Sequence, residues 1–335
     1  MSAKNKRKVW RFGSIFIIAA AGSLLFGCRI KLAERSLPII VTNIAVNKSQ
    51  PANSVISNSM PNEANNRANA ETSETFPNSS AKKSPANSRF DFAVARNLNL
   101  AKNLVWAFGG KLQRGWYLYR PLICQAVGVE IEASENDFAA GLSNWQRANG
   151  LPPNGILDEV ALAVLVTKWQ ANRLKIRGYP SPNELLVAPT ADFYDVSRPD
   201  ELRQVQRETY AAYKKLVAAA IADKSLNLAN NGRGELAPSE KFLKIVSAFR
   251  SREYQNKLRR ETPNSGRAGL AVGNSPHFTG RALDVYVGGD PVITKDENRF
   301  VQINTPVYQW LVKNAERFGF KPYFYEPWHW EYAPD

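Results

Sequence analysis

The chain has 335 residues, and its 44% hydrophobic content is ordinary for globular protein and sufficient for two modest domains plus extensions. Its 44 Lys and Arg outnumber 30 Asp and Glu, and the formal net charge of +14 favours an anionic partner. Charge alone excludes none of three such partners: nucleic acid, phospholipid headgroups and cell-wall polymer.

Residues 1–28 have the layout of an export signal. Several Lys and Arg precede an apolar run from Ile15 to Phe26. The run is about a dozen residues long, whereas a membrane-spanning helix needs roughly 20, so a cleaved signal is expected rather than a permanent span. We therefore expect an exported protein of the cell envelope that has no nucleic-acid partner.

The apolar run ends with Leu-Phe-Gly-Cys at 25–28, which resembles the lipobox of bacterial lipoproteins. The resemblance implies that Cys28 carries a lipid, becomes the new N-terminus and anchors the chain to a membrane. The alternative is an uncleaved anchor with an incidental cysteine. If Cys28 is lipidated, no intramolecular disulfide is possible, and Cys124, in the apolar run 121–127, is expected to be a buried thiol.

Residues 29–91 are expected to form a flexible tether. From about Val46 to Ser88 the sequence consists mainly of Asn, Ser, Ala and Pro, so it cannot bury enough apolar surface to offset the entropy lost on ordering. About 40 such residues have a root-mean-square span of roughly 35 Å. A domain fixed to the membrane by this tether would reach wall beyond the membrane surface.

A small all-α module is predicted over 92–175. Phe138, Leu142 and Trp145 recur at helical spacing and share one face. Asp158 follows a Pro-Pro turn and can cap the next helix.

This part of the sequence resembles the final helices and connecting turn of the peptidoglycan-binding-domain family. The residues that carry the resemblance are Trp145, Gln146, Asn149, Gly150, Leu151, Asn154, Gly155, Asp158 and Leu165. The resemblance implies peptidoglycan as a partner. A purely structural or docking module is the alternative, because the earlier half of the segment lacks the family's usual Asp-Gly turn.

A proline-containing linker over 176–192 leads to a C-terminal domain over 193–335. Ser197 and Pro199 predict the start of a helix whose apolar residues recur at threes and fours as far as Ile221. The remaining elements expected are strands over 242–249 and 281–287 and a helix from Thr305 to Gly319. This mixture predicts an α+β fold with an antiparallel sheet.

The whole chain contains two histidines, His277 and His329. An open catalytic zinc site needs three protein ligands drawn from His and carboxylates. Asp284 follows His277 by seven residues, and a turn near Gly280 would point both side chains to the same side. We therefore expect His277, Asp284 and His329 to bind Zn²⁺. Singly, each could be a packed core residue or a strand-end cap.

Glu326 precedes His329 by three residues. A turn at Pro327 would bring its carboxylate beside the metal without making it a ligand, which is the position of a general base. A structural zinc is not expected, because such sites close with four ligands, usually including cysteines, and the domain has none.

Two motifs resemble the signature of the VanY-type zinc D-alanyl-D-alanine peptidases. They are Ser-x-His-x-x-Gly-x-Ala-x-Asp at 275–284 and Glu-x-Trp-His-x-Glu-Tyr at 326–332. The resemblance implies zinc-dependent removal of the terminal D-Ala from peptidoglycan stem peptides. The alternatives are a zinc endopeptidase or L,D-peptidase that cuts cross-links, and a non-catalytic wall-binding adaptor. The adaptor would be expected to have lost a ligand or the base.

The segment that ends at Gln255 resembles the family's strand-end Tyr-Arg-Ser and the following Gln. This implies that Arg250 and Gln255 face the active site, with the planar guanidinium binding a substrate carboxylate or the developing oxyanion. Ser275 would hold substrate or orient its loop. Phe249 stands where the family has Tyr, and Arg252 competes with Arg250 for the same role, while a surface salt bridge is the structural alternative for Arg250.

Overall fold

The structure is a computed structural model that describes residues 89–261 and 275–334. Contacts divide the chain at residue 77, and all described residues lie in the second unit, 77–335. The predicted signal, Cys28 and the tether up to residue 88 lie outside the described residues. Within them, no helix has the length and apolar character needed to cross a membrane.

The N-terminal part of the described chain contains four helices and one β-hairpin. In chain order these are α1 (Asp91–Asn103), β1 (Val105–Phe108), β2 (Lys111–Arg114), α2 (Arg120–Val127), α3 (Glu135–Ala148) and α4 (Glu159–Ala171). The sequence predicted helices alone in this part, so the β-hairpin corrects that prediction. Phe108 pairs with Lys111 across Gly109 and Gly110, whose φ angles are 58° and 75°. Two glycines with positive φ are what a tight two-residue hairpin turn requires.

Two expectations for this part are confirmed. The Asp158 carboxylate accepts a hydrogen bond of 2.9 Å from the backbone N–H of Ala161 and so caps α4. Cys124 is a fully buried free thiol on α2. Asn97 joins α1 to the segment before α4, because its buried side chain donates to the carbonyl of Gly155 and accepts from the N–H of Leu157.

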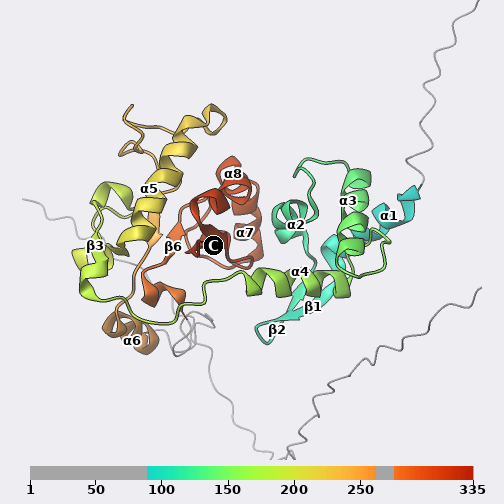
Figure 1. Ribbon diagram of the computed structural model, residues 1–335, viewed down its shortest axis with the longest axis horizontal. Coiled ribbons are helices and arrows are strands. Elements are labelled where there is room, and N and C mark those ends of the chain that lie inside the picture. Colours follow the sequence, from blue (N-terminus) through green and yellow to red (C-terminus); the bar gives the residue numbers. More distant parts are fainter. Residues whose placement is uncertain (1–88, 262–274, 335) are drawn as a thin grey trace, which may run out of the picture. The chain divides into compact units, whose positions relative to one another are not determined.

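The C-terminal part is α+β with an antiparallel sheet, as expected. This sheet has four strands, of which β6 is labelled in Figure 1. The strands, in their order across the sheet, are β5 (Ile245–Ser247), β6 (Ala282–Val285), β8 (His329–Tyr332) and β7 (Phe320–Pro322). The helices of this part are α5 (Arg207–Ala222), α6 (Arg252–Glu261), α7 (Asp296–Ile303) and α8 (Pro306–Asn314). All four residues of the central strand β6 are buried, so its side chains are not divided between a core face and a solvent face.

The helix predicted from Ser197 begins ten residues later, at Arg207. Residues Gln204–Gln206 form β4 instead, which pairs with β3 (Leu185–Val187). Strand pairing uses the backbone groups that a helix would need, and the Gln206 side chain then caps α5 by accepting from the N–H of Thr209 at 2.8 Å. The buried face of α5 agrees with the apolar spacing that predicted it.

The predicted helix from Thr305 is also present. The Thr305 hydroxyl accepts from the N–H of Tyr308, a 3-10 turn continues α8, and Gly319 ends it with a φ of 80°. Sequence analysis did not predict α7, which has a mixed polar composition.

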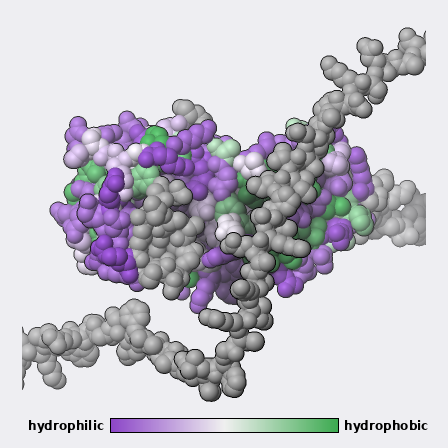
Figure 2. Space-filling model, turned by 90° about the horizontal axis from the view of Figure 1, so that it is seen from below, coloured by the Kyte–Doolittle hydropathy of each residue, from purple (hydrophilic) through white to green (hydrophobic). Residues whose placement is uncertain are grey.

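Aromatic side chains connect the N-terminal part to the loop that precedes β8. The ring of Phe324 is buried, and its centroid lies 5.4 Å from that of Tyr119 and 5.5 Å from that of Trp169. Helix α2 also packs against α8. With these large apolar side chains in the core, the face of the molecule in Figure 2 is mainly hydrophilic, with hydrophobic residues in scattered patches.

The α4 cap gives a test of this description. Replacing Asp158 by Ala removes the acceptor for one unpaired helix N–H, so the free energy of unfolding should fall by about 1 kcal/mol. Asp158→Asn keeps an acceptor and should lose much less. Denaturant unfolding followed by circular dichroism measures both, and equal losses for the two variants would contradict the capping role.

Candidate metal centre

Three separate segments bring together the residues singled out as metal ligands. His277 lies in a 3-10 turn, η8 (Pro276–Thr279), Asp284 lies in β6, and His329 is the first residue of β8. The register of the sheet pairs Asp284 directly with His329. All three side chains are buried.

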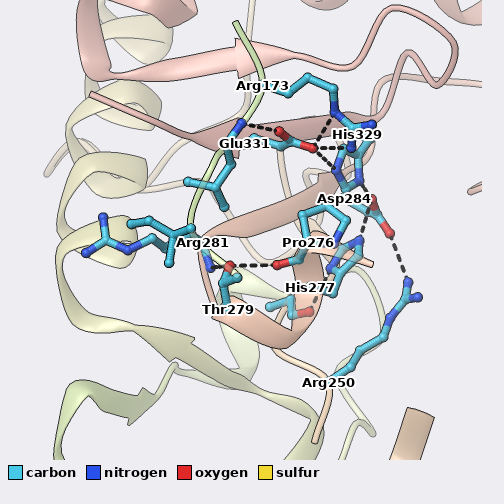
Figure 3. A network of polar contacts seen from close by, with 12 residues as sticks. Arg173, Arg250, Pro276, His277, Thr279, Arg281, Asp284, His329 and Glu331 are labelled. Carbon is cyan, nitrogen blue, oxygen red and sulfur yellow. Dashed lines mark hydrogen bonds and ion pairs between the residues drawn. The ribbon is translucent and has the colours of Figure 1, made fainter. Parts of the chain in front are cut away.

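The side chains of these three residues point toward one another (Figure 3), and the distances between them suit a single small cation. Asp284 Oδ1 lies 3.2 Å from His277 Nε2 and 2.8 Å from His329 Nδ1. One ligand atom from each residue lies within 4.8 Å of the others. Nitrogen and oxygen ligands at 2.0 to 2.1 Å from a tetrahedral Zn²⁺ are about 3.3 Å apart, so the donor set fits this ion.

The ring of His277 is oriented by the backbone. Its Nδ1 lies 2.8 Å from the carbonyl oxygen of Ala248, which can only accept, so Nδ1 is the donor and Nε2 keeps its lone pair. The predicted turn at Gly280 is present with a φ of 69°. A Cβ added at Gly280 would lie 3.1 Å from the backbone nitrogen of Gln206, so only glycine fits here without strain.

The second nitrogen of His329 faces another carboxylate. Among the described residues His329 Nε2 makes no hydrogen bond, but Glu331 Oε1 lies 3.4 Å from it. Glu331 itself is fixed by Arg173 and by the N–H of Leu174. The pair Glu331–His329 therefore has the arrangement in which a carboxylate orients a metal-binding imidazole.

The charges around these residues favour a cation. Burial opposes the charged form of His329, but the hydrogen bond to Asp284 and the nearby negative charge of Glu331 outweigh burial and raise the pKa of the imidazole to about 9. Burial would raise the pKa of the Asp284 carboxyl, yet the neighbouring histidines hold it well below its usual range. Burial and the charge of Arg250 lower the pKa of His277 to about 4, which favours the neutral form that binds metals.

Glu326 lies at the start of the turn that leads into β8. The N–H of His329 donates to the carbonyl of Glu326 at 2.9 Å, which closes a turn with Pro327 in its second position. Burial, helped by the charge of Asp284, raises the pKa of the Glu326 carboxyl, while His329 and Arg250 oppose the rise. A carboxyl with a raised pKa is suited to general acid–base chemistry.

Arg250 lies beside the candidate ligands. Its guanidinium is 3.5 Å from Asp284 Oδ2 and donates to the hydroxyl of Ser247, and its backbone N–H donates to the carbonyl of His277. Arg252 is exposed on α6, where its guanidinium lies 5.0 Å from the ring centroid of Tyr179. The structure thus brings Arg250 rather than Arg252 to Asp284.

The two predicted substrate-contacting residues are both buried. Gln255 lies on α6, and Ser275 directly precedes η8. The Ser275 hydroxyl makes no hydrogen bond in the part of the chain that the structure describes. A buried hydroxyl without a partner, two residues before His277, is available to a bound group.

Sequence analysis assigned no role to three residues near this centre. Glu331 was part of a motif, and its position two residues after His329 in a strand, hence on the same face, was the signal for it. Arg173 had no local signal. Arg198 is partly buried, which lowers its pKa, with a further lowering by the charge of Arg250 and an opposing effect of Asp284.

Two comparisons with known proteins gave matches. Residues 202–335 match the family model described as VanY: D-alanyl-D-alanine carboxypeptidase. A solved structure described as "Structure of the LdcB LD-carboxypeptidase reveals the molecular basis of peptidoglycan recognition" is 23% identical, with a TM-score of 0.32, and covers 47% of this chain and 70% of that chain. No curated protein gives a significant match.

The three candidate metal ligands and the candidate base should differ in their effect on zinc binding when each is replaced. Replacing His277, Asp284 or His329 by Ala removes a donor atom, so each variant should lose zinc after dialysis. Glu326→Gln should retain zinc, because this side chain is expected to transfer protons and not to bind the ion. Turnover should fall by about 10²-fold or more. Metal content measured by mass spectrometry decides it. A folded Glu326→Gln protein without zinc would refute the assignment.

Proposed function

We propose that this chain is a zinc-dependent D,D-carboxypeptidase that removes the terminal D-Ala from peptidoglycan stem peptides during cell-wall remodelling. One observation carries the proposal: the buried group His277–Asp284–His329 lies within the segment that matches the VanY family. Two imidazoles and one carboxylate are the donor set of an open catalytic zinc site rather than of a closed structural one.

Zinc bound here would polarise the scissile carbonyl and lower the pKa of water. The other steps belong to residues of the chain. Glu326 takes a proton from the attacking water as the water oxygen bonds to the D-Ala carbonyl carbon, and then delivers that proton to the leaving amine as the C–N bond breaks. One peptide bond and one water are consumed, and two products, the shortened peptide and free D-Ala, are formed.

Arg250 supports cleavage at the free end of the peptide. Its side chain is 18% exposed, and its contact with Asp284 is long, at 3.5 Å. Some of the guanidinium N–H groups can therefore donate hydrogen bonds to a bound ligand. A planar guanidinium binds a carboxylate or an oxyanion with two parallel hydrogen bonds. A stem peptide with a free C-terminus offers such a carboxylate, whereas a cross-linked peptide does not offer one at the bond that an endopeptidase cuts.

We further propose that the protein is exported and held at the membrane through Cys28, or through an uncleaved signal anchor, with peptidoglycan as its partner. The basic and apolar segments of 1–28 support this. The motif around Trp145 supports wall binding by residues 92–175.

The substrate test compares a pentapeptide that ends in D-Ala-D-Ala with its C-terminal amide. The acid should release one D-Ala, and the amide should react about ten- to a hundred-fold more slowly, because the lost charge-assisted hydrogen bonds are worth roughly 1.5 to 3 kcal/mol. Arg250→Ala should slow the acid far more than the amide. Mass spectrometry of the products measures both rates.

Two outcomes would overturn this assignment. Equal rates on acid and amide in the unaltered protein would remove the role of the terminal carboxylate. Conversion of cross-linked dimers into monomers without free D-Ala would favour an endopeptidase. Arg252→Ala provides the comparison for Arg250, and a loss of the acid preference in that variant alone would transfer the role to Arg252.

A further inference from the structure

We infer that Arg173 is a positioning residue of the catalytic centre, acting on His329 through Glu331. Arg173 lies two residues after the end of α4 and outside the segment that matches the VanY family, which begins at residue 202. The inference rests on the proposed function in one respect, because it takes His329 as a metal ligand.

Arg173 and the next residue, Leu174, together bind both oxygens of the Glu331 carboxylate. Arg173 Nε donates to Glu331 Oε1 at 2.9 Å, and its Nη2 pairs with the same oxygen. The backbone N–H of Leu174 donates to Oε2 at 2.8 Å. Glu331 is 1% exposed, so the segment provides charge-assisted hydrogen bonds where water has little access.

The held carboxylate in turn restrains the imidazole of His329. Glu331 Oε1 lies 3.4 Å from Nε2 of the ring, while Nδ1 lies 2.8 Å from Asp284. An imidazole with a carboxylate at each nitrogen has its ring plane restrained from both sides, and a proton on Nε2 facing Glu331 leaves Nδ1 free to bind a metal. In Figure 3 the contacts run from Arg173 through Glu331 and His329 to Asp284.

A second set of contacts fixes the place of Arg173. Its guanidinium lies 4.1 Å from the ring centroid of Tyr323, and the Tyr323 ring meets His329 edge-on at 5.8 Å. The backbone N–H of Tyr323 also donates to the carbonyl of His329 at 3.0 Å. Trp169, which lies on α4 four residues before Arg173, stacks on Phe324. Arg173 is thus packed against the same loop that leads to the metal ligand.

Loss of Arg173 would leave Glu331 as a buried carboxylate without its strongest cation. A buried charge in that state is costly, so the side chain is expected to rotate toward water. This movement weakens its contact with His329. The predicted consequence is weaker zinc binding, because changes to groups that orient metal ligands reduce affinity about 10- to 100-fold.

The experiment measures zinc affinity by competition with a chelator, using the full chain. Arg173→Met should bind zinc about tenfold more weakly, and Glu331→Gln between about 10- and 100-fold more weakly. The double variant should be no weaker than Glu331→Gln, because both changes break one pathway. Arg173→Lys keeps the charge and should restore part of the loss, although it lacks the planar fork.

Arg120→Met is a matched control. Arg120 also pairs with a glutamate, Glu135, and lies over an aromatic ring, that of Phe138, with a side chain 25% exposed against 23% for Arg173. Its variant should bind zinc as tightly as the unaltered protein. The thermal midpoint of each metal-free protein, compared between Arg173→Met and Arg120→Met, separates a loss of general stability from a specific effect on the metal.

Unchanged zinc affinity in Arg173→Met would overturn the inference, as would a further loss when it is added to Glu331→Gln. If Arg173→Met does not fold, Arg173→Lys and Arg173→Gln make the same comparison. Failure of the proposed function looks different: an unaltered protein that binds zinc without releasing D-Ala would refute the activity while leaving the role of Arg173 to be decided by the affinities.

Discussion

The antiparallel pairing of β6 with β8 is the constraint on which the rest of the centre depends, because it places Asp284 opposite His329. Alternate residues of a strand point to opposite faces, so a shift of one residue would send one of these side chains to the other side of the sheet. His277 reaches the same place from η8, whose end is set by the turn at Gly280. The same pairing also determines the position of Glu326, since the turn that contains this residue leads directly into β8.

The centre concentrates ionisable side chains in a place with little water. Asp284 and Glu331 are buried carboxylates on either side of His329. Two arginines oppose them at the outer ends of the network, Arg250 at Asp284 and Arg173 at Glu331, as Figure 3 shows. Removing either partner from such a buried pair lowers the free energy of unfolding far more than breaking a surface ion pair does. These contacts therefore fix the positions of the side chains as well as contributing to stability.

The N-terminal part of the described chain has a direct physical connection to this centre. Its aromatic residues pack on Phe324 in the loop before β8, and Arg173 continues from α4 to Glu331. The buried strand β8 is thereby supported by a segment far away in sequence. The geometry of the candidate ligands depends on residues on both sides of the boundary at which the family match begins.

The sequence by itself determined the features that depend on near neighbours. The caps at Asp158 and Thr305 were predictable because a side chain bonds its own helix, and the candidate ligands were singled out from two short motifs with meaningful spacing. Only the tertiary structure decided that residues 204–206 form a strand, and that Arg173 approaches Glu331 across 158 positions. Contacts at such separations leave no periodicity in the sequence, because they arise when distant segments pack together.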